Sequence, residues 1–241
     1  MTDASDDGGA RGMRSAAAQD KTALRHAALR RRRDVDAATR AAAGERLARV
    51  AAGSGLLPGP DSVGCGDARR AVAEAPLVAA YVSMGTEIDM RPLLALLLSS
   101  GRRVIVPMLG RGLDVGWGAL ESLDGLRRTG ARRPDEPGAA VTLGPEALHG
   151  ARLILVPALA VDARGVRLGR GGGWYDRALR HRAPGAVVAA VCWPWEVLGD
   201  GDALPCEPHD LPVDAVLTPE GCTRLRGAGG DPRRVGGATR M

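Results

Sequence analysis

The stretch LILVPALAVDARGVRLGRGGGWYDR, residues 153–177, decides the fold class of this chain. It opens with a short apolar run that is typical of a buried strand, and Pro157 ends that run. A glycine-rich loop follows, and the residues from Trp174 onward are typical of the start of a helix. A strand that leads through a glycine loop into a helix indicates an α/β protein.

Other short apolar runs extend this pattern along the chain. We expect strands at residues 77–82, 104–106, 153–156, 187–191 and 213–217, with a hairpin around residues 113–117. Between the first two strands we expect a helix that Asp89 caps and Gly101 ends. A strand, a helix and a second strand within about 30 residues indicate a parallel βαβ unit. The predicted fold class is α/β, with a parallel or mixed sheet and helices on both faces.

The organisation that we expect is one α/β domain at residues 20–218 with a disordered tail at each end. Residues 1–19 and 219–241 are rich in glycine, small and charged residues and show no apolar periodicity, so they bury too little surface to offset their ordering entropy. Residues 21–52 carry the helix formers Ala, Leu and Arg and predict one long or broken helix. Residues 108–150 give the weakest pattern, and we assign no chemistry to them.

Composition excludes several classes of protein. The four cysteines are widely spaced and form no Cys-x-x-Cys pair, which argues against a zinc cluster. No stretch reaches the roughly 18 apolar residues of a membrane span, and the N-terminus lacks the apolar segment of a secretory signal. We therefore expect a cytoplasmic protein with no membrane partner. The net charge of +5 fits a phosphate-rich or carboxylate-rich small molecule as well as a nucleic acid.

The loop at residues 167–176 carries the densest signal for chemistry. Its four glycines let backbone N–H groups approach an anion closely, and the helix that follows adds a partial positive charge. Arg167 and Arg170 supply the charge that a phosphate needs. The loop matches neither the Walker pattern nor the dinucleotide fingerprint. The residues alone leave two interpretations, a phosphate-binding loop or a flexible glycine turn with surface arginines.

Five other side chains also have two interpretations each. Asp176 either stabilises the start of the new helix or holds Mg²⁺ beside a triphosphate. Asp210, in a loop whose path prolines fix, is either a plain loop carboxylate or a presented ligand. Glu87 is either an exposed loop glutamate or a partner for the N–H donors of a ring at the carboxyl edge of the sheet. Lys21 and Arg25, one helical turn apart, either face solvent or reach one phosphate chain together.

The arginine run at residues 30–33 resembles a nucleic-acid-binding patch in composition. No aromatic residues are interleaved with it, which argues against that function. We therefore interpret it as a solvated helix surface.

Four blocks, taken in order, resemble the 5-formyltetrahydrofolate cyclo-ligase family, also called methenyltetrahydrofolate synthetase. The blocks are Lys21-x-x-Leu-Arg25, Tyr81-x-Ser-x-x-x-Glu87-Ile, the block from Val156-Pro to Tyr175-Asp176-Arg177, and Pro205-x-Glu-Pro-His-Asp210 with Asp214. The resemblance covers residues 21–218 and implies a single Rossmann-like domain. It also implies that ATP and Mg²⁺ drive the conversion of 5-formyltetrahydrofolate to 5,10-methenyltetrahydrofolate. In the implied mechanism the formyl oxygen attacks the γ-phosphorus of ATP, N10 attacks the activated carbon, and phosphate departs.

The resemblance implies a role for each site residue. For ATP it implies Lys21, Arg25, Arg167, Leu168, Gly169, Arg170, Gly171, Gly172, Gly173, Trp174 and Tyr175, with Arg167 and Arg170 as the catalytic residues. For the folate it implies Val82, Glu87, Arg170, Gly171, Gly172, Gly173 and Trp174. For Mg²⁺ it implies Asp176 and Asp210. Gly172 stands where some members of the family carry Lys, and Trp174 stands where Tyr or Phe is usual.

The expected partners are therefore small molecules, the folate and ATP, bound by a monomer that has no nucleic-acid partner. Two other functions stay open on the sequence. The first is an ATP-dependent ligase or kinase of the same fold with a different acceptor, because residues 108–150 match the family poorly. The second is a basic nucleic-acid-binding protein, which a strongly salt-dependent affinity for DNA or RNA would reveal.

Overall fold

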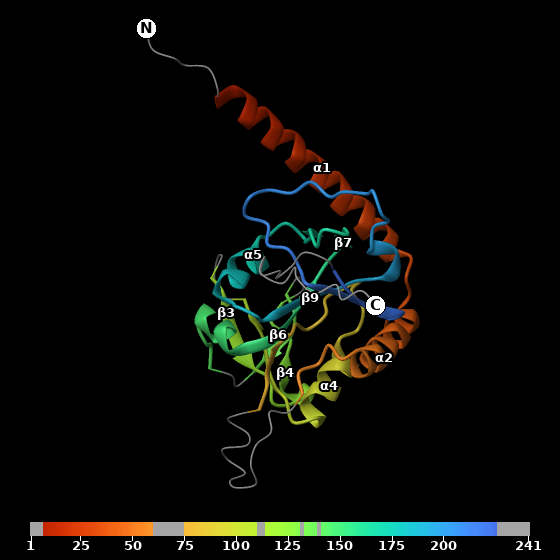
Figure 1. Cartoon of the computed structure of the whole chain (residues 1–241). Helices are drawn as coiled ribbons and strands as arrows, with labels where there is room; N and C mark the ends of the chain where they lie inside the picture. The colour runs from red at the N-terminus through yellow and green to blue at the C-terminus, as the bar shows by residue number, and fades with distance from the viewer. Residues whose placement is uncertain (1–6, 60–74, 110–113, 131–132, 139–140, 226–241) are drawn as a thin grey trace, which may run out of the picture.

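The computed structural model describes residues 7–59, 75–109, 114–130, 133–138 and 141–225 of the chain (Figure 1). The α-helices are α1 (Asp7–Arg33), α2 (Ala37–Gly53), α4 (Arg91–Ser99) and α5 (Trp174–Ala178). The short 3₁₀ helices are η1 (Leu123–Gly125), η2 (Pro145–Gly150), η3 (Leu179–His181) and η4 (Pro194–Glu196). The strands are β1 (Leu77–Ala79), β2 (Arg103–Met108), β3 (Gly116–Ala119), β4 (Leu126–Arg127), β5 (Glu136–Pro137), β6 (Ala151–Pro157), β7 (Ala160–Val161), β8 (Arg167–Leu168), β9 (Val187–Val191), β10 (Ala215–Thr218) and β11 (Gly221–Arg224).

The main sheet of the described residues has seven strands in the order β11-β10-β9-β6-β1-β2-β3. The inner strands are all parallel; in the β1–β6 pair, for example, Val78 lies opposite Leu153. Strands β3 and β11 pair antiparallel at the two edges. The sheet is therefore mixed, and both the β1–α4–β2 unit and the β2–β3 hairpin confirm predictions from the sequence.

Side chains of β6 alternate between two apolar layers because successive residues of a strand point to opposite faces. Leu153 and Leu155 pack on one face with the buried side chains of α2 and α4. Ile154 and Val156 pack on the other face with Trp117 and with residues of η2, η3 and α5. Figure 1 shows α2 and α4 on one side of the sheet and α5 on the other. Helices cover both faces, as predicted, although those of the second face are short.

Helices α1 and α2 divide the long helical segment that the sequence predicted. Asp36 separates them, because its carboxylate accepts a hydrogen bond of 2.7 Å from the Thr39 N–H and so caps α2. The cap of α4 differs from the prediction: Met90 is its N-cap residue, while the Asp89 carboxylate accepts from the Arg91 N–H at 3.0 Å. Gly101 follows α4 with φ at 74°, a conformation that glycine adopts at no steric cost.

The two predicted tails differ from the structure in part. Helix α1 begins at Asp7, so it includes residues 7–19, which we expected to be disordered. Alanine and arginine, both strong helix formers, dominate the later part of that segment and favour its continuation as helix. At the other end, β11 pairs with β10 through Thr218 and Gly221, so the folded domain continues past residue 218. Residues 1–6 and 226–241 lie outside the described residues.

Candidate active site

The order of strands reverses between β1 and β6: β2 lies beyond β1 on one side, and β9 and β10 follow β6 on the other. In parallel sheets of this kind, ligands bind outside the carboxyl ends of the strands at such a reversal. A cleft of about 510 Å³ lies at this position, lined by Tyr81 and Val82 after β1 and by Pro157 and Ala158 at the end of β6. Its volume is in the range of small-molecule sites.

Every site residue that the sequence predicted lines this cleft. They are Lys21, Arg25, Val82, Glu87, Arg167, Leu168, Gly169, Arg170, Gly171, Gly172, Gly173, Trp174, Tyr175, Asp176 and Asp210. The other lining residues are Arg32, Tyr81, Met84, Pro107, Leu109, Pro134, Pro157, Ala158, Leu159, Glu207 and His209. Glu207 and His209 lie in the proline-rich loop that the sequence singled out. Leu109 and Pro134 come from the segment to which it assigned no chemistry.

The glycine loop runs from β8 to α5 and contacts helix α1. Gly171 has φ at 100° and Gly173 has φ at 61°, both in the left-handed region that glycine favours. The Arg25 Nε donates a hydrogen bond of 2.9 Å to the carbonyl of Gly169. A Cβ on Gly171 would lie 3.4 Å from the Arg25 guanidinium, so the loop and α1 lie close together.

The helix after the loop is shorter than the sequence interpretation assumed. Helix α5 has five residues, Trp174–Ala178, and continues as the 3₁₀ helix η3. A helix this short has a small dipole, because the dipole is a sum over aligned peptide units. The positive charge of this end of the cleft therefore comes mainly from side chains.

Arg167 and Asp176 form an ion pair at the base of the loop. One terminal nitrogen of Arg167 donates to Asp176 Oδ1 at 2.6 Å, and the Arg167 side chain is almost fully buried. Its guanidinium carbon lies 5.9 Å from the centre of the Tyr175 ring. The buried Arg167 Nε has no hydrogen-bond partner among the described residues. Arg167 lines the cleft, and a guanidinium held in a fixed position is well suited to bind an oxyanion.

Lys21, the only lysine of the chain, binds two carboxylates of the proline-rich loop. Its Nζ lies 2.6 Å from Asp210 Oδ2 and 2.8 Å from Glu207 Oε2. Burial favours a lower pKa for Lys21, but the two carboxylates outweigh it and the pKa is raised. Burial likewise favours a higher pKa for Asp210, but the hydrogen bonds from Lys21 and from the Glu207 N–H outweigh it and the pKa is lowered. The cluster is thus fully charged at neutral pH.

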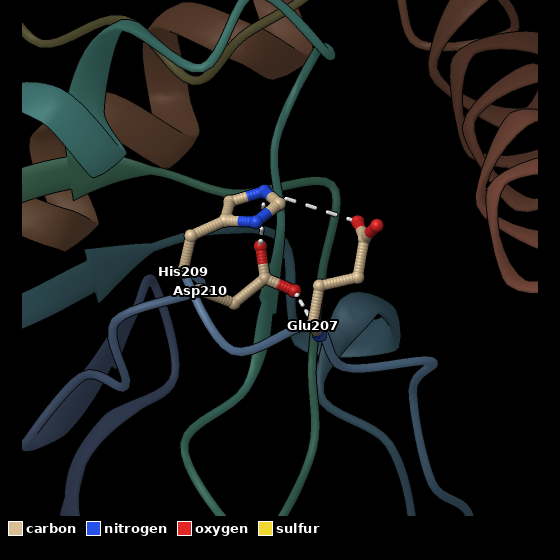
Figure 2. Close-up of side chains that lie close together, drawn as sticks. All are labelled: Glu207, His209 and Asp210. Carbon is tan, nitrogen blue, oxygen red and sulfur yellow. Dashed lines mark hydrogen bonds and ion pairs between the residues drawn. The ribbon is translucent and has the colours of Figure 1, made fainter. Parts of the chain in front are cut away.

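Figure 2 shows the imidazole of His209 above the carboxylate of Asp210, with the carboxylate of Glu207 to one side of the ring. Its Nε2 lies 3.8 Å from Asp210 Oδ1 and 3.9 Å from Glu207 Oε2. One ligand atom from each of the three residues lies within 4.8 Å of the others. Asp176 does not belong to this group, although it lines the same cleft.

Glu87 and Arg170, which both line the cleft, form an ion pair. Glu87 is buried, and its Oε1 lies 3.3 Å from the Arg170 Nε. Its Oε2 accepts a hydrogen bond of 2.8 Å from the Met84 N–H. Burial raises the pKa of the Glu87 carboxyl, and Arg170 and the Met84 N–H oppose that change without cancelling it. The exposed loop glutamate that the sequence left open is excluded by this burial.

The raised pKa of Glu87 predicts a pH-dependent effect of Glu87→Gln on stability. A carboxyl whose pKa is higher in the folded state contributes stability below its unfolded pKa and loses it as the pH rises through the folded pKa. Glutamine does not titrate, so the melting temperature of the variant relative to wild type should increase as the pH rises from the ordinary value of 4.5 towards neutral. Thermal unfolding at several pH values measures this difference. A constant difference over that range would contradict a raised pKa.

Aromatic and apolar side chains form the wall of the cleft next to Glu87. The Trp174 ring lies 5.1 Å from that of Trp117 and 4.9 Å from that of Tyr175, both in edge-on contact. The Trp174 Nε1 donates to the carbonyl of Asp114 at 3.1 Å, which fixes the orientation of the ring. Pro107, Leu109 and Pro134 complete the lining, and the Leu109 N–H donates to the buried Glu136 carboxylate at 2.9 Å.

Comparison with known proteins agrees with this geometry. The sequence profile of the 5-formyltetrahydrofolate cyclo-ligase family matches residues 67–219. A 5-formyltetrahydrofolate cyclo-ligase of Mycolicibacterium smegmatis is 38% identical over 215 residues, which cover 86% of this chain and 98% of the relative. The chain belongs to the 5-formyltetrahydrofolate cyclo-ligase family. The resemblance drawn from the four sequence blocks is thereby confirmed.

Two solved structures of methenyltetrahydrofolate synthetases are similar in fold to this member of the cyclo-ligase family. That of Aquifex aeolicus has 26% identity and a TM-score of 0.64, with 86% of this chain and 93% of the other covered. The fold of the Mycoplasma pneumoniae enzyme is also similar, with a TM-score of 0.59 at 19% identity over 83% of this chain and 99% of the other. None of the helices in the described part of the chain combines the length and apolar character that a membrane crossing requires.

Proposed function

We propose that this chain uses ATP and Mg²⁺ to convert 5-formyltetrahydrofolate to 5,10-methenyltetrahydrofolate, with release of ADP and phosphate. One observation carries the proposal: a single cleft joins a cation-rich glycine loop to a buried carboxylate with an apolar wall. The part of the cleft at the glycine loop suits a triphosphate, and the part at the buried carboxylate suits a flat ring with polar edges. Membership of the cyclo-ligase family supports the same reaction.

For ATP we propose the end of the cleft formed by Lys21, Arg25 and residues 167–175. Arg167 supports this role, because it lines the cleft at the glycine loop and its guanidinium is held in place by Asp176. Arg170 has a side chain that is 43% exposed, so it is free to turn from Glu87 towards a bound phosphate. Arg167 and Arg170 are therefore the proposed catalytic residues.

For Mg²⁺ we propose Asp176 and Asp210. Carboxylate oxygens are the protein ligands that Mg²⁺ prefers, usually one or two of them together with water and phosphate. Each of these carboxylates accepts a 2.6 Å hydrogen bond from a cation, Lys21 at Asp210 and Arg167 at Asp176, so Mg²⁺ would share each carboxylate with that cation or replace it. Bound there, Mg²⁺ would neutralise part of the phosphate charge during transfer.

For the folate we propose Val82, Glu87 and the loop from Arg170 to Trp174. Glu87 presents a carboxylate at the bottom of the cleft, where it would accept hydrogen bonds from the N–H groups of the pterin ring. The apolar wall with Trp174 would cover the face of that ring. This arrangement would place the 5-formyl group between Glu87 and the glycine loop.

The chemistry then requires positioning and charge stabilisation from the protein. The formyl oxygen attacks the γ-phosphorus of ATP, and ADP leaves with the electrons of the broken P–O bond. N10 attacks the activated formyl carbon and gives up its N–H proton to solvent or to the departing phosphate. The C–O bond breaks to release phosphate, and the N5 lone pair completes the methenyl bridge. Arg167 and Arg170 would stabilise the negative charge on the transferring phosphoryl group, as expected for phosphoryl transfer.

The proposal predicts that purified protein forms the methenyl chromophore only when ATP, Mg²⁺ and 5-formyltetrahydrofolate are all present. ADP and methenyl product should appear in equal amounts, because one phosphoryl transfer accompanies each ring closure. Absorbance of the product and a coupled assay for ADP measure the two. Product formation without ATP would overturn the proposal, and ADP formation without methenyl product would indicate a ligase or kinase with another acceptor.

We further propose that the protein acts as a cytoplasmic monomer without a nucleic-acid partner. The arginine run at residues 30–33 supports the last point, because one of its members is used internally: Arg32 is buried and paired with Glu196. The sequence interpretation of this whole run as a solvated surface was wrong at Arg32. Sedimentation with and without a short DNA duplex would test the assembly state and the absence of nucleic-acid binding together.

A further inference from the structure

Arg32 and Glu196 form a buried ion pair between helix α1 and the loop after β9. Their residue surfaces are 2% and 3% exposed. The Arg32 Nε lies 2.7 Å from Glu196 Oε1, and one terminal nitrogen lies 2.7 Å from Glu196 Oε2. The same terminal nitrogen donates to the carbonyl of Ala158 at 2.6 Å. Arg32 therefore joins α1 to the carboxyl edge of the sheet through two separate chain segments.

Glu196 is itself fixed by the backbone around it. It lies in η4, and its Oε2 also accepts a hydrogen bond of 2.9 Å from the Trp193 N–H. Trp193 stacks on Trp195 with ring centres 4.7 Å apart, and the Arg31 guanidinium lies 5.0 Å from the Trp195 ring. Adjacent residues of α1 thus contact both the buried pair and the tryptophan stack.

Lys21 and Arg25 also line the cleft, and they lie on the same face of α1 as Arg32. Lys21 and Arg32 are eleven residues apart, which is about three helical turns, and Arg25 lies one turn after Lys21. Among the described side chains of α1, from residue 20 onward, the apolar support is small: Ala28 and Leu29 pack on a minor cluster, and Leu24 is 40% exposed. A helix with so little apolar contact needs other interactions to fix its rotation and its position along its axis.

Stability alone is a weak explanation for this pair. The desolvation free energy of two buried charges offsets most of their mutual attraction. Apolar residues of similar size often replace such pairs without loss of stability. Buried ion pairs are best established as devices that specify one arrangement over another. Arg32 lines the cleft, but its Nε and one terminal nitrogen are bound to Glu196 and to the Ala158 carbonyl, so most of its donors are already used inside the protein.

We infer that Arg32 and Glu196 are positioning residues, which hold α1 in the register that brings Lys21 and Arg25 to the ATP end of the cleft. The ATP part of this inference rests on the proposed function. The helix-docking part rests only on the contacts of the structure. A change in the pair should therefore affect α1 in the free protein, and should weaken ATP binding more than it slows the chemical step.

The test is the double variant Arg32→Met with Glu196→Gln. This variant leaves no unpaired charge, and Gln keeps an oxygen acceptor for the Trp193 N–H, so the fold should survive. We expect amide hydrogen exchange in residues 20–33 to accelerate about tenfold or more while exchange in α2 stays unchanged. We also expect the KM for ATP to rise about tenfold, with kcat changing less than about threefold.

Two further variants make the result decisive. Arg32→Lys keeps both charges and should restore much of the exchange protection and of the ATP affinity, although it loses the bidentate geometry. Arg91→Met with Asp135→Asn removes the exposed pair between α4 and residue 135, and should change neither measurement. Wild-type exchange in α1 and wild-type KM for ATP in the double variant would overturn the inference. If the wild type itself fails to bind ATP, the proposed function fails, whereas the exchange result still decides whether the pair docks α1.

Discussion

Replacing Arg167 by Met should lower kcat/KM for the cyclo-ligase reaction about a thousandfold, because a buried cation next to the transferring phosphoryl group is lost. The ion pair with Asp176 holds the guanidinium in place at the glycine loop, where Arg167 lines the cleft. Met keeps an unbranched apolar stem but supplies neither charge nor donor. Steady-state kinetics with both substrates varied would measure the loss.

Comparison with other variants separates this effect from a loss of folding. Arg167→Lys should recover only part of the activity, since an ammonium group keeps the charge without the planar fork. Arg127→Met is the matched control, because Arg127 is exposed and bonds only to neighbouring carbonyls among the described contacts. The melting temperature of Arg167→Met should fall by only a few degrees, because the cleft lets water reach Asp176. A variant with near wild-type kcat/KM would exclude Arg167 from the chemistry.

The fold was predictable where a segment carries its own signal. The apolar run at residues 153–156 is buried on both faces of the sheet, so it is recognisable as a central strand without knowledge of its neighbours. The β2–β3 hairpin and the β1–α4–β2 unit were local enough to be predicted as well. The short strands β7 and β8 were not, because their antiparallel pairing depends on the path of the loop between them.

The cleft was predictable to the extent that its residues belong to short motifs. The residues at 167–176 and the proline-rich loop were each marked by composition, and the structure brings both to one cleft. Arg32 had no such signal. It is one of four successive arginines, and its partner Glu196 is 164 residues away along the chain. Helical periodicity puts Arg32 on the same face as Lys21 and Arg25, but it does not connect that face to Glu196, so only the tertiary structure shows that Arg32 is buried in an ion pair.

The structure also changes the meaning of the two acidic residues that the sequence assigned to a metal. Asp176 and Asp210 were considered as isolated carboxylates, each either structural or metal-binding. Each instead belongs to an ion pair, with Arg167 or with Lys21. An experiment on either carboxylate must therefore separate loss of a metal ligand from release of a cation.

Asp176→Asn and Asp210→Asn should each lower kcat/KM about a hundredfold at limiting Mg²⁺, since losing a ligand or its charge typically costs a few kcal/mol and each 1.36 kcal/mol is about tenfold in rate. Asparagine keeps the size of the side chain, so packing should survive. The Mg²⁺ concentration for half-maximal rate should rise in both variants, and excess Mg²⁺ should restore part of the activity. If both residues act through one ion, the double variant should lose much less than the product of the two single losses.

Glu207→Gln provides the matched control for Asp210→Asn, because Glu207 and Asp210 bind the same Lys21 ammonium group. If Asp210 holds the metal, Asp210→Asn should raise the Mg²⁺ requirement while Glu207→Gln leaves it within about twofold, since the Lys21 contact is weakened in both. Equal effects of the two variants would mean that Asp210 has no role that Glu207 lacks, so that both act through Lys21 or both belong to one ligand group with His209. Full activity of Asp176→Asn at limiting Mg²⁺ would be more serious, because the glycine loop would then have no metal partner and the whole assignment of the ATP end would fail.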